Sequence, residues 1–151
     1  MKIILCPTRG GKESHPNQDF AINLAKERGA ELLFLYVSSI SFIRRVGPPI
    51  VVDIEKEMDE LGEFLLSMAQ ERAETSGVPA KVAVRRGVFS KVLREVIDEY
   101  QISTVTLGRS AVESGNVSDE RLQELSRELS KEMCVEFYIV QDGELFFHTE
   151  T

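Results

Sequence analysis

The fold is indicated most clearly by residues 80–110, which read AKVAVRRGVFSKVLREVIDEYQISTVTLGRS. Residues 80–86 alternate apolar and polar side chains as a strand does, and residues 88–100 repeat valine at every fourth position of one helical stripe. Residues 103–107 form a second short apolar run. A strand, a helix and a second strand in this order predict a βαβ unit, because a crossover of this length joins parallel strands.

The same alternation continues on both sides of this unit. Before it, strand-like runs at residues 2–7 and 31–37 enclose a helical pattern at residues 16–28. After it, apolar residues at helical spacing within residues 122–133 lead to a strand-like run at residues 135–141. Together these patterns predict an α/β fold: a Rossmann-like open twisted sheet of five parallel strands with helices on both faces.

The longest predicted helix begins at Ile54, behind Asp53 as its N-cap, and ends before Gly77. Residues 38–52, which precede it, have no helical period and predict an excursion of the chain. The acidic residues between positions 55 and 63 are expected on the solvated face of this helix. Its expected buried face is the apolar stripe Met58, Leu61, Leu65, Met68, Ala69 and Ala73.

Residues 142–151 do not continue the alternation of strand and helix patterns. Asp142-Gly143 is a two-residue hairpin signal, and residues 144–148, ELFFH, are apolar enough to return as an antiparallel edge strand. We expect this hairpin strand and tail to belong to the same domain as residues 1–141. Because a bare edge strand with two phenylalanines attracts a partner, we expect either a homodimer joined along residues 135–141 and 144–148 or a strand folded onto its own core.

The composition limits the classes of protein to which the chain can belong. Its 151 residues suit one domain, and its net charge of −7 disfavours binding to nucleic acid. No apolar stretch is long enough to cross a bilayer and the N-terminus does not read as a signal peptide, so we expect a cytoplasmic protein that does not bind membranes. Cys6 and Cys134 lack metal-ligand spacing and are expected to be buried, unreactive thiols.

Arginine and glycine follow several of the apolar runs, at residues 8–10, 85–87 and 108–110. The carboxyl ends of parallel strands meet at one edge of a sheet, which is where open α/β sheets bind their ligands. The strand at residues 2–7 and the one at residues 103–107 are expected to be neighbours at the point where the strand order reverses. The sequence therefore predicts that guanidinium groups gather at this edge.

Arg9 and Arg109 would then face one crevice, with Ser110 as a further hydrogen-bond donor. Such a crevice predicts a site for a phosphate or another anion. The alternative is that these arginines form ordinary surface ion pairs, for example with Glu13 or Glu113, which contribute little energy.

The order of elements and three local strings resemble the universal stress protein family. The strings are KIILCPTRGG at residues 2–11, LAKERGAELLFLYV at residues 24–37 and RRGVFSKVLREVIDEYQISTVTLGRS at residues 85–110. The resemblance covers the chain up to about Gln141. It implies a five-stranded parallel sheet, a dimer and, as in part of the family, binding of ATP.

The ATP-binding members of that family use an aspartate at the end of the first strand and the pattern G-x2-G-x9-G-[S/T] after the fourth. Arg9 stands in the place of the aspartate, and Gly108 matches the first glycine. Ala111 stands at the second glycine, and Arg121-Leu122 at the final pair. Because the glycines and the hydroxyl let backbone and side chain approach phosphate, these replacements predict that ATP binds weakly or not at all.

The sequence thus predicts a regulatory or stress-response module with a degenerate nucleotide site, which takes ATP, another adenine nucleotide or another small anion. The alternatives are a ligand-free dimeric module that binds another protein and, third, a weak nucleotide hydrolase. No catalytic residue, metal site or firm cofactor is predicted. The expected ligand-binding residues, including Val37 as a backbone partner for adenine, are Thr8, Arg9, Gly10, Val37, Gly108, Arg109, Ser110 and Arg121.

Overall fold

The computed structural model describes residues 2–9, 14–38, 48–108, 119–141 and 143–149. Their strands and helices follow one another as β1 (Ile3–Pro7), α1 (His15–Arg28), β2 (Glu31–Ser38), α2 (Pro48–Thr75), β3 (Ala80–Arg86), α3 (Phe89–Tyr100), β4 (Thr104–Gly108), α4 (Asp119–Met133), β5 (Glu136–Gln141) and β6 (Glu144–Thr149). They form one sheet in the order β3-β2-β1-β4-β5-β6. The first five strands are parallel and β6 is antiparallel to β5, which confirms the predicted fold class.

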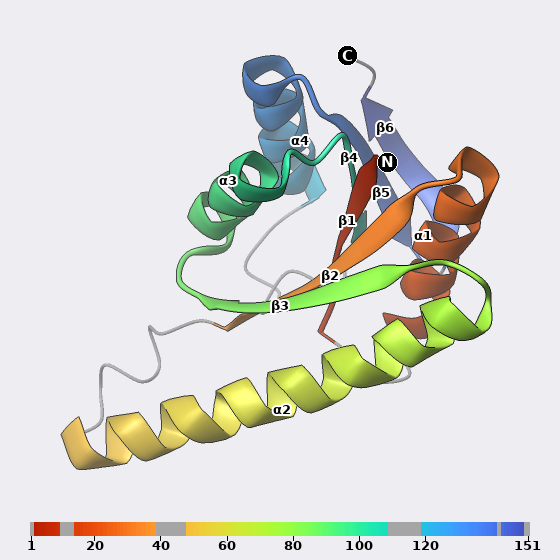
Figure 1. Cartoon of the computed structure of the whole chain (residues 1–151). Coiled ribbons are helices and arrows are strands. Elements are labelled where there is room, and N and C mark those ends of the chain that lie inside the picture. The colour runs from red at the N-terminus through yellow and green to blue at the C-terminus, as the bar shows by residue number, and fades with distance from the viewer. Residues whose placement is uncertain (1, 10–13, 39–47, 109–118, 142, 150–151) are drawn as a thin grey trace.

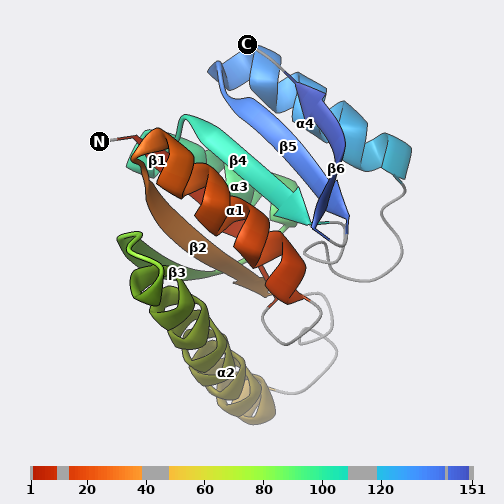
Figure 2. The same cartoon turned by 90° about the vertical axis from the view of Figure 1, so that its right-hand side faces the viewer.

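The helices cover both faces of the sheet, as Figures 1 and 2 show. Alternate strand residues point to opposite faces, so that Ile4 and Cys6 of β1 pack under α1 and α2, whereas Leu5 packs under α3 and α4. In the same way, Leu32 and Phe34 of β2 face α1 and α2, whereas Leu33 and Leu35 face α3 and α4. Burial on both faces explains why the strands read as nearly continuous apolar runs.

The helix α2 begins earlier than the sequence predicts. Its first residue is Pro48 and not Ile54, so the predicted excursion at residues 38–52 is wrong for its last five residues, 48–52. Proline at positions 48 and 49 suits the first turn of a helix, where the missing N–H has no partner to lose. Residues 39–47 lie outside the described part of the chain.

The buried face of α2 matches the prediction at Ala69 and Ala73 but not at Leu61 and Met68. The helix turns Gly62, Leu66, Ala69 and Ala73 to the sheet, while Leu61 and Met68 are exposed. A Cβ on Gly62 would lie 2.9 Å from Cδ1 of the β2 residue Tyr36, closer than real Cβ contacts allow. The tyrosine ring therefore sets which side of α2 faces the sheet, and the small residues let the helix approach closely.

The hairpin strand β6 folds onto its own sheet, with Tyr138 opposite His148 and Ile139 opposite Phe147. The predicted antiparallel hairpin strand is thus confirmed, whereas the homodimer joined along it stays a prediction. The ring of Phe147 packs against the core and lies 5.0 Å from the guanidinium carbon of Arg127. Its neighbour Phe146 is exposed. The edge of β5 is thus covered within the chain, and β6 becomes the new edge.

The two cysteines have different surroundings. Cys6 is buried in β1, and this burial raises the pKa of its thiol to about 12. Cys134, which lies between α4 and β5, is exposed, so the expectation of a buried thiol is wrong there. Its backbone has a positive φ of 54°. Among the residues that the structure describes, no helix is long and apolar enough to span a bilayer.

Candidate functional site

The carboxyl edge of the sheet brings two of the predicted segments together. The strands β1 and β4 are hydrogen-bonded neighbours, with Ile4 opposite Thr104 and Leu5 opposite Val105. From this pair the chain extends to β2 and β3 on one side and to β5 and β6 on the other, so the strand order reverses here. The residues after β1 and the last residue of β4 therefore lie at the switch point, where open α/β sheets bind ligands.

Thr8 is the first residue after β1 at this edge. It is buried, and its backbone N–H donates to the carbonyl of Leu35 at 2.8 Å. Its hydroxyl accepts a hydrogen bond from Nε2 of Gln18 at 3.0 Å, and Oε1 of Gln18 accepts one from Arg72 at 2.6 Å. Arg72 also forms an ion pair with Asp19. Thr8 thus joins β1 to α1 and α2, so its hydroxyl is already engaged by the protein.

Gly108 lies beneath the side chain of Asn17, which comes from the first turn of α1. A Cβ at position 108 would lie 2.0 Å from Nδ2 and 2.7 Å from Cγ of Asn17. The space that the glycine leaves is therefore filled by the amide of Asn17. Sequence analysis missed this residue, although its position at the start of a helix that follows β1 indicates that it faces the carboxyl edge.

Arg9, the second residue after β1, is exposed, and no residue in the described part of the chain forms an ion pair with it. Arg85 and Arg86 do not gather beside it, contrary to the prediction. Nη2 of Arg85 lies 2.9 Å from Oε2 of Glu99 on α3, and Arg86 pairs with Asp59 on α2. Arg9, at the switch point, is therefore the one of these three arginines that has no acidic partner among the described residues.

The remaining predicted residues are not brought to one described site. Val37 is half-buried and packs against the core. Arg121 is exposed in the first turn of α4 and lines a groove of about 430 Å³ between α3 and α4, which does not include Thr8, Arg9 or Gly108. Three predicted residues and the two proposed acidic partners lie outside the described residues: Gly10, Arg109, Ser110, Glu13 and Glu113.

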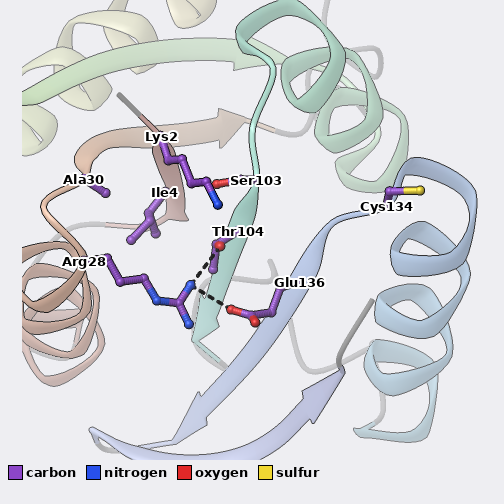
Figure 3. Close-up of a pocket in the computed structure, with 8 residues that line it drawn as sticks. All are labelled: Lys2, Ile4, Arg28, Ala30, Ser103, Thr104, Cys134 and Glu136. Atoms are coloured by element: carbon purple, nitrogen blue, oxygen red, sulfur yellow. Dashed lines mark hydrogen bonds and ion pairs between the residues drawn. The ribbon is translucent and has the colours of Figure 1, made fainter.

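A second hollow lies at the opposite, amino edge of the sheet and was not predicted (Figure 3). It has a volume of about 610 Å³ and is lined by Lys2, Ile4, Arg28, Ala30, Ser103, Thr104, Cys134 and Glu136. Figure 3 shows Arg28 and Glu136 directed toward one another across it, with Thr104 beside them. Cationic, anionic and hydroxyl groups thus meet where β1, β4 and β5 begin.

Arg28 is the centre of this amino-edge cluster, which we define as Arg28, Thr104, Glu136, Tyr138 and His148. Its Nη1 lies 2.8 Å from Oε1 of Glu136 and donates to the hydroxyl of Thr104 at 3.2 Å, while Nη2 donates to the hydroxyl of Tyr138 at 2.7 Å. Burial raises the pKa of Glu136, but the hydrogen bond and charge of Arg28 outweigh it and hold that pKa below its usual value. Both terminal nitrogens of the Arg28 guanidinium therefore have protein partners.

The aromatic side of the amino-edge cluster includes the hairpin strand. The rings of Tyr138 and His148 are stacked, with centroids 4.1 Å apart and planes inclined by 11°. Nε2 of His148 lies 3.6 Å from Oε2 of Glu136. The cluster thus joins the end of α1 to β4, β5 and β6. In the described residues, no group of three or more His, Cys, Asp and Glu side chains is placed to hold a metal ion.

Comparison with known proteins gives both a family and a fold. The model of the universal stress protein family matches residues 1–128. The universal stress protein UspA from Lactobacillus plantarum is 15% identical, with a TM-score of 0.72 over 92% of this chain and 97% of that one. No curated protein sequence matches the chain.

Two further similar structures were solved with nucleotides. A universal stress protein in complex with cAMP is 17% identical, with a TM-score of 0.61 over 93% of this chain and 97% of that one. A universal stress protein from Archaeoglobus fulgidus in complex with dAMP is 12% identical, with a TM-score of 0.55 over 93% of this chain and 96% of that one. At these identities, the likeness shows a shared fold.

Proposed function

The chain belongs to the universal stress protein family, and we propose that it is a regulatory or stress-response module that binds a small anion, such as an adenine nucleotide, at the carboxyl edge of its sheet. The observation that carries this proposal is Arg9, an exposed guanidinium at the switch point without an acidic partner among the described residues. A guanidinium binds phosphate through two parallel hydrogen bonds. The complexes of similar proteins with cAMP and dAMP make an adenine nucleotide the first ligand to test.

We expect this binding to be weak. The amide of Asn17 occupies the space beside Gly108, so a phosphate cannot approach that backbone closely. Thr8 is buried, so its hydroxyl is not open to a phosphate from solution. Arg9 supplies a charge-assisted contact in their place. In this proposal, attraction to the phosphate charge contributes more to affinity than a fitted phosphate loop does.

Isothermal titration with AMP, cAMP and Mg-ATP tests the proposal. We expect dissociation constants weaker than the low micromolar range, and a loss of affinity of about tenfold in Arg9→Ala, because one charge-assisted contact to phosphate is removed. The matched control is Lys26→Ala, which removes an exposed cation at the far end of α1. Low-micromolar binding of Mg-ATP would show that the replaced family residues do not matter. If Arg9→Ala bound the nucleotides as tightly as the wild type does, Arg9 would not be part of the site.

A homodimer that recognises another protein is the second candidate function. It is favoured by the edge strand β6, whose residues Leu145 and Phe146 are exposed. Light scattering at tens of micromolar checks it, with the double variant Leu145→Ser/Phe146→Ser and a truncation after Gln141. A monomeric wild type excludes this dimer, and a dimer that survives both changes is joined elsewhere.

A further inference from the structure

The outward face of α2 carries a row of exposed apolar side chains. Leu61, Phe64 and Met68 are 52%, 62% and 46% exposed. Their spacing of three and four residues places them one above another on a single helical face. This α2 row lies away from the buried face of Gly62 and Leu66, which packs on the sheet. Exposed apolar side chains that are contiguous in this way mark a surface that binds another molecule.

Carboxylates border the α2 row. Glu57 lies one turn before Leu61, and Glu71 lies one turn after Met68, so both continue the row at its ends. Glu60 lies one turn before Phe64 and borders it on one side. All three acids are exposed, and none has an ion pair within the residues that the structure describes.

The other border of the row does not cancel this charge. Leu65, which continues the row toward α1, is half-buried. Beyond it, Arg72 is held by Asp19 and by the side-chain oxygen of Gln18. Lys56, an exposed cation one turn before Glu60, offsets one of the three acids. The surface is thus an apolar centre with a net acidic rim. Its occupant must bring apolar side chains together with positive charge.

We propose that the α2 row is the docking site for a basic amphipathic helix of a partner protein. A helix with apolar residues at the spacing i, i+3 and i+7 fits a row that extends about 10 Å along α2. Lysine or arginine at the edges of that apolar face would meet Glu57, Glu60 and Glu71. The complementarity of charge selects the partner, and the apolar centre supplies most of the affinity.

A second copy of this chain fits the surface less well. Antiparallel pairing of two α2 helices about Phe64 would place Glu57 opposite Glu71 at both ends. Parallel pairing would place each glutamate beside its own equivalent. Either arrangement brings like charges together, which opposes association.

The test uses the full chain and a fluorescent synthetic helix of leucine and lysine with an amphipathic pattern. We expect saturable binding to one site, and no binding by a peptide in which glutamate replaces lysine. Phe64→Ser should weaken binding at least tenfold, as loss of a central aromatic side chain does in interfaces. Met68→Ser should weaken it severalfold. Both residues are exposed, so circular dichroism and the melting temperature should stay close to those of the wild type.

Matched controls separate this site from general attraction to an acidic protein. Phe146→Ser removes an exposed phenylalanine on β6, and Glu95→Gln with Glu124→Gln removes two exposed acids on α3 and α4. Neither control should change binding, whereas Glu57→Gln with Glu60→Gln should weaken it severalfold and flatten its dependence on salt. Equal effects of Phe64→Ser and Phe146→Ser, or no saturable binding, would overturn the proposal. So would a wild-type dimer that Phe64→Ser dissociates, because the occupant would then be a second copy.

Discussion

The two edges of the sheet use arginine in opposite ways. At the amino edge, Arg28 contacts Glu136, Thr104 and Tyr138, so its charge and both terminal nitrogens already have partners within the fold. At the carboxyl edge, Arg9 extends from the end of β1 without an acidic partner among the described residues. A guanidinium that is already paired stabilises the protein, whereas an unpaired one is available to a ligand. The comparison therefore separates residues that hold the sheet together from residues that we propose bind an anion.

The largest effect is expected where the carboxyl edge is most closely packed. Gly108→Val would drive a side chain into Asn17, because even a single added carbon lies 2.0 Å from Nδ2. We expect a loss of about 1–3 kcal/mol in the free energy of unfolding, the usual cost of overpacking. Urea denaturation measures it, and Asn17→Ala in the same chain should recover part of the loss. If Gly108→Val is as stable as the wild type, Asn17 does not occupy this space in solution.

Breaking the amino-edge cluster should have the next largest effect. Arg28→Ala leaves the half-buried carboxylate of Glu136 without its cation and removes donors to Thr104 and Tyr138. Because the arginine is partly exposed, we expect a loss of about 1–2 kcal/mol and not the larger cost of a fully buried pair. Thermal and urea unfolding measure this loss, with Lys26→Ala on the same helix as the control. A change within the range of the control would show that the cluster does not stabilise the fold.

The amino-edge cluster should also make the free energy of unfolding depend on pH, and this effect should be smaller than that of Arg28→Ala. The folded protein holds the pKa of Glu136 below its usual value, so this group stabilises the fold above about pH 4.5, the pKa region of an unfolded glutamate. That contribution is lost as the pH falls through the lower folded pKa. Glu136→Gln should therefore narrow the difference in stability between neutral and acidic solution. Unfolding by urea at several pH values checks this, and an unchanged difference in Glu136→Gln would contradict it.

The smallest effect on stability should come from Arg9. Because its guanidinium has no acidic partner in the described structure, Arg9→Ala should change the free energy of unfolding by less than about 0.5 kcal/mol. The variant should lose affinity for adenine nucleotides while it keeps the wild-type melting temperature in their absence. A clear destabilisation would mean that Arg9, like Arg28, serves the fold, and the contrast between the two edges would fail.

Strand order and strand adjacency could be predicted because they follow from local rules. The apolar runs and the helical stripes between them are short-range patterns, and right-handed crossovers leave few ways to arrange them. This is why the neighbouring positions of β1 and β4, and with them the switch point beside Arg9, agree with the sequence prediction. The antiparallel return of β6 likewise follows from the turn signal before it.

The errors arise where residues distant in sequence decide the outcome. Arg85 and Arg86 are drawn to Glu99 and Asp59, which lie on two different helices. The partners of Arg28 lie 76 to 110 residues away, so no local pattern marks the amino-edge cluster. The predicted buried face of α2 is right at Ala69 and Ala73 but wrong at Leu61 and Met68. Two sides of this helix carry apolar residues, and the packing against β2, including Tyr36, leaves no local pattern that distinguishes them.

The manner in which α2 rests on the sheet has a consequence for its local unfolding. From residue 56 to residue 61 none of its described side chains is buried, whereas Gly62, Leu66, Ala69 and Ala73 are. A helix held mainly by tertiary packing opens first where that packing is weakest. Amide hydrogens before Gly62 should therefore exchange with deuterium by local fraying, and those after Leu66 only with a larger opening of the domain. A partner bound across Leu61 and Phe64 would slow exchange in the first of these segments.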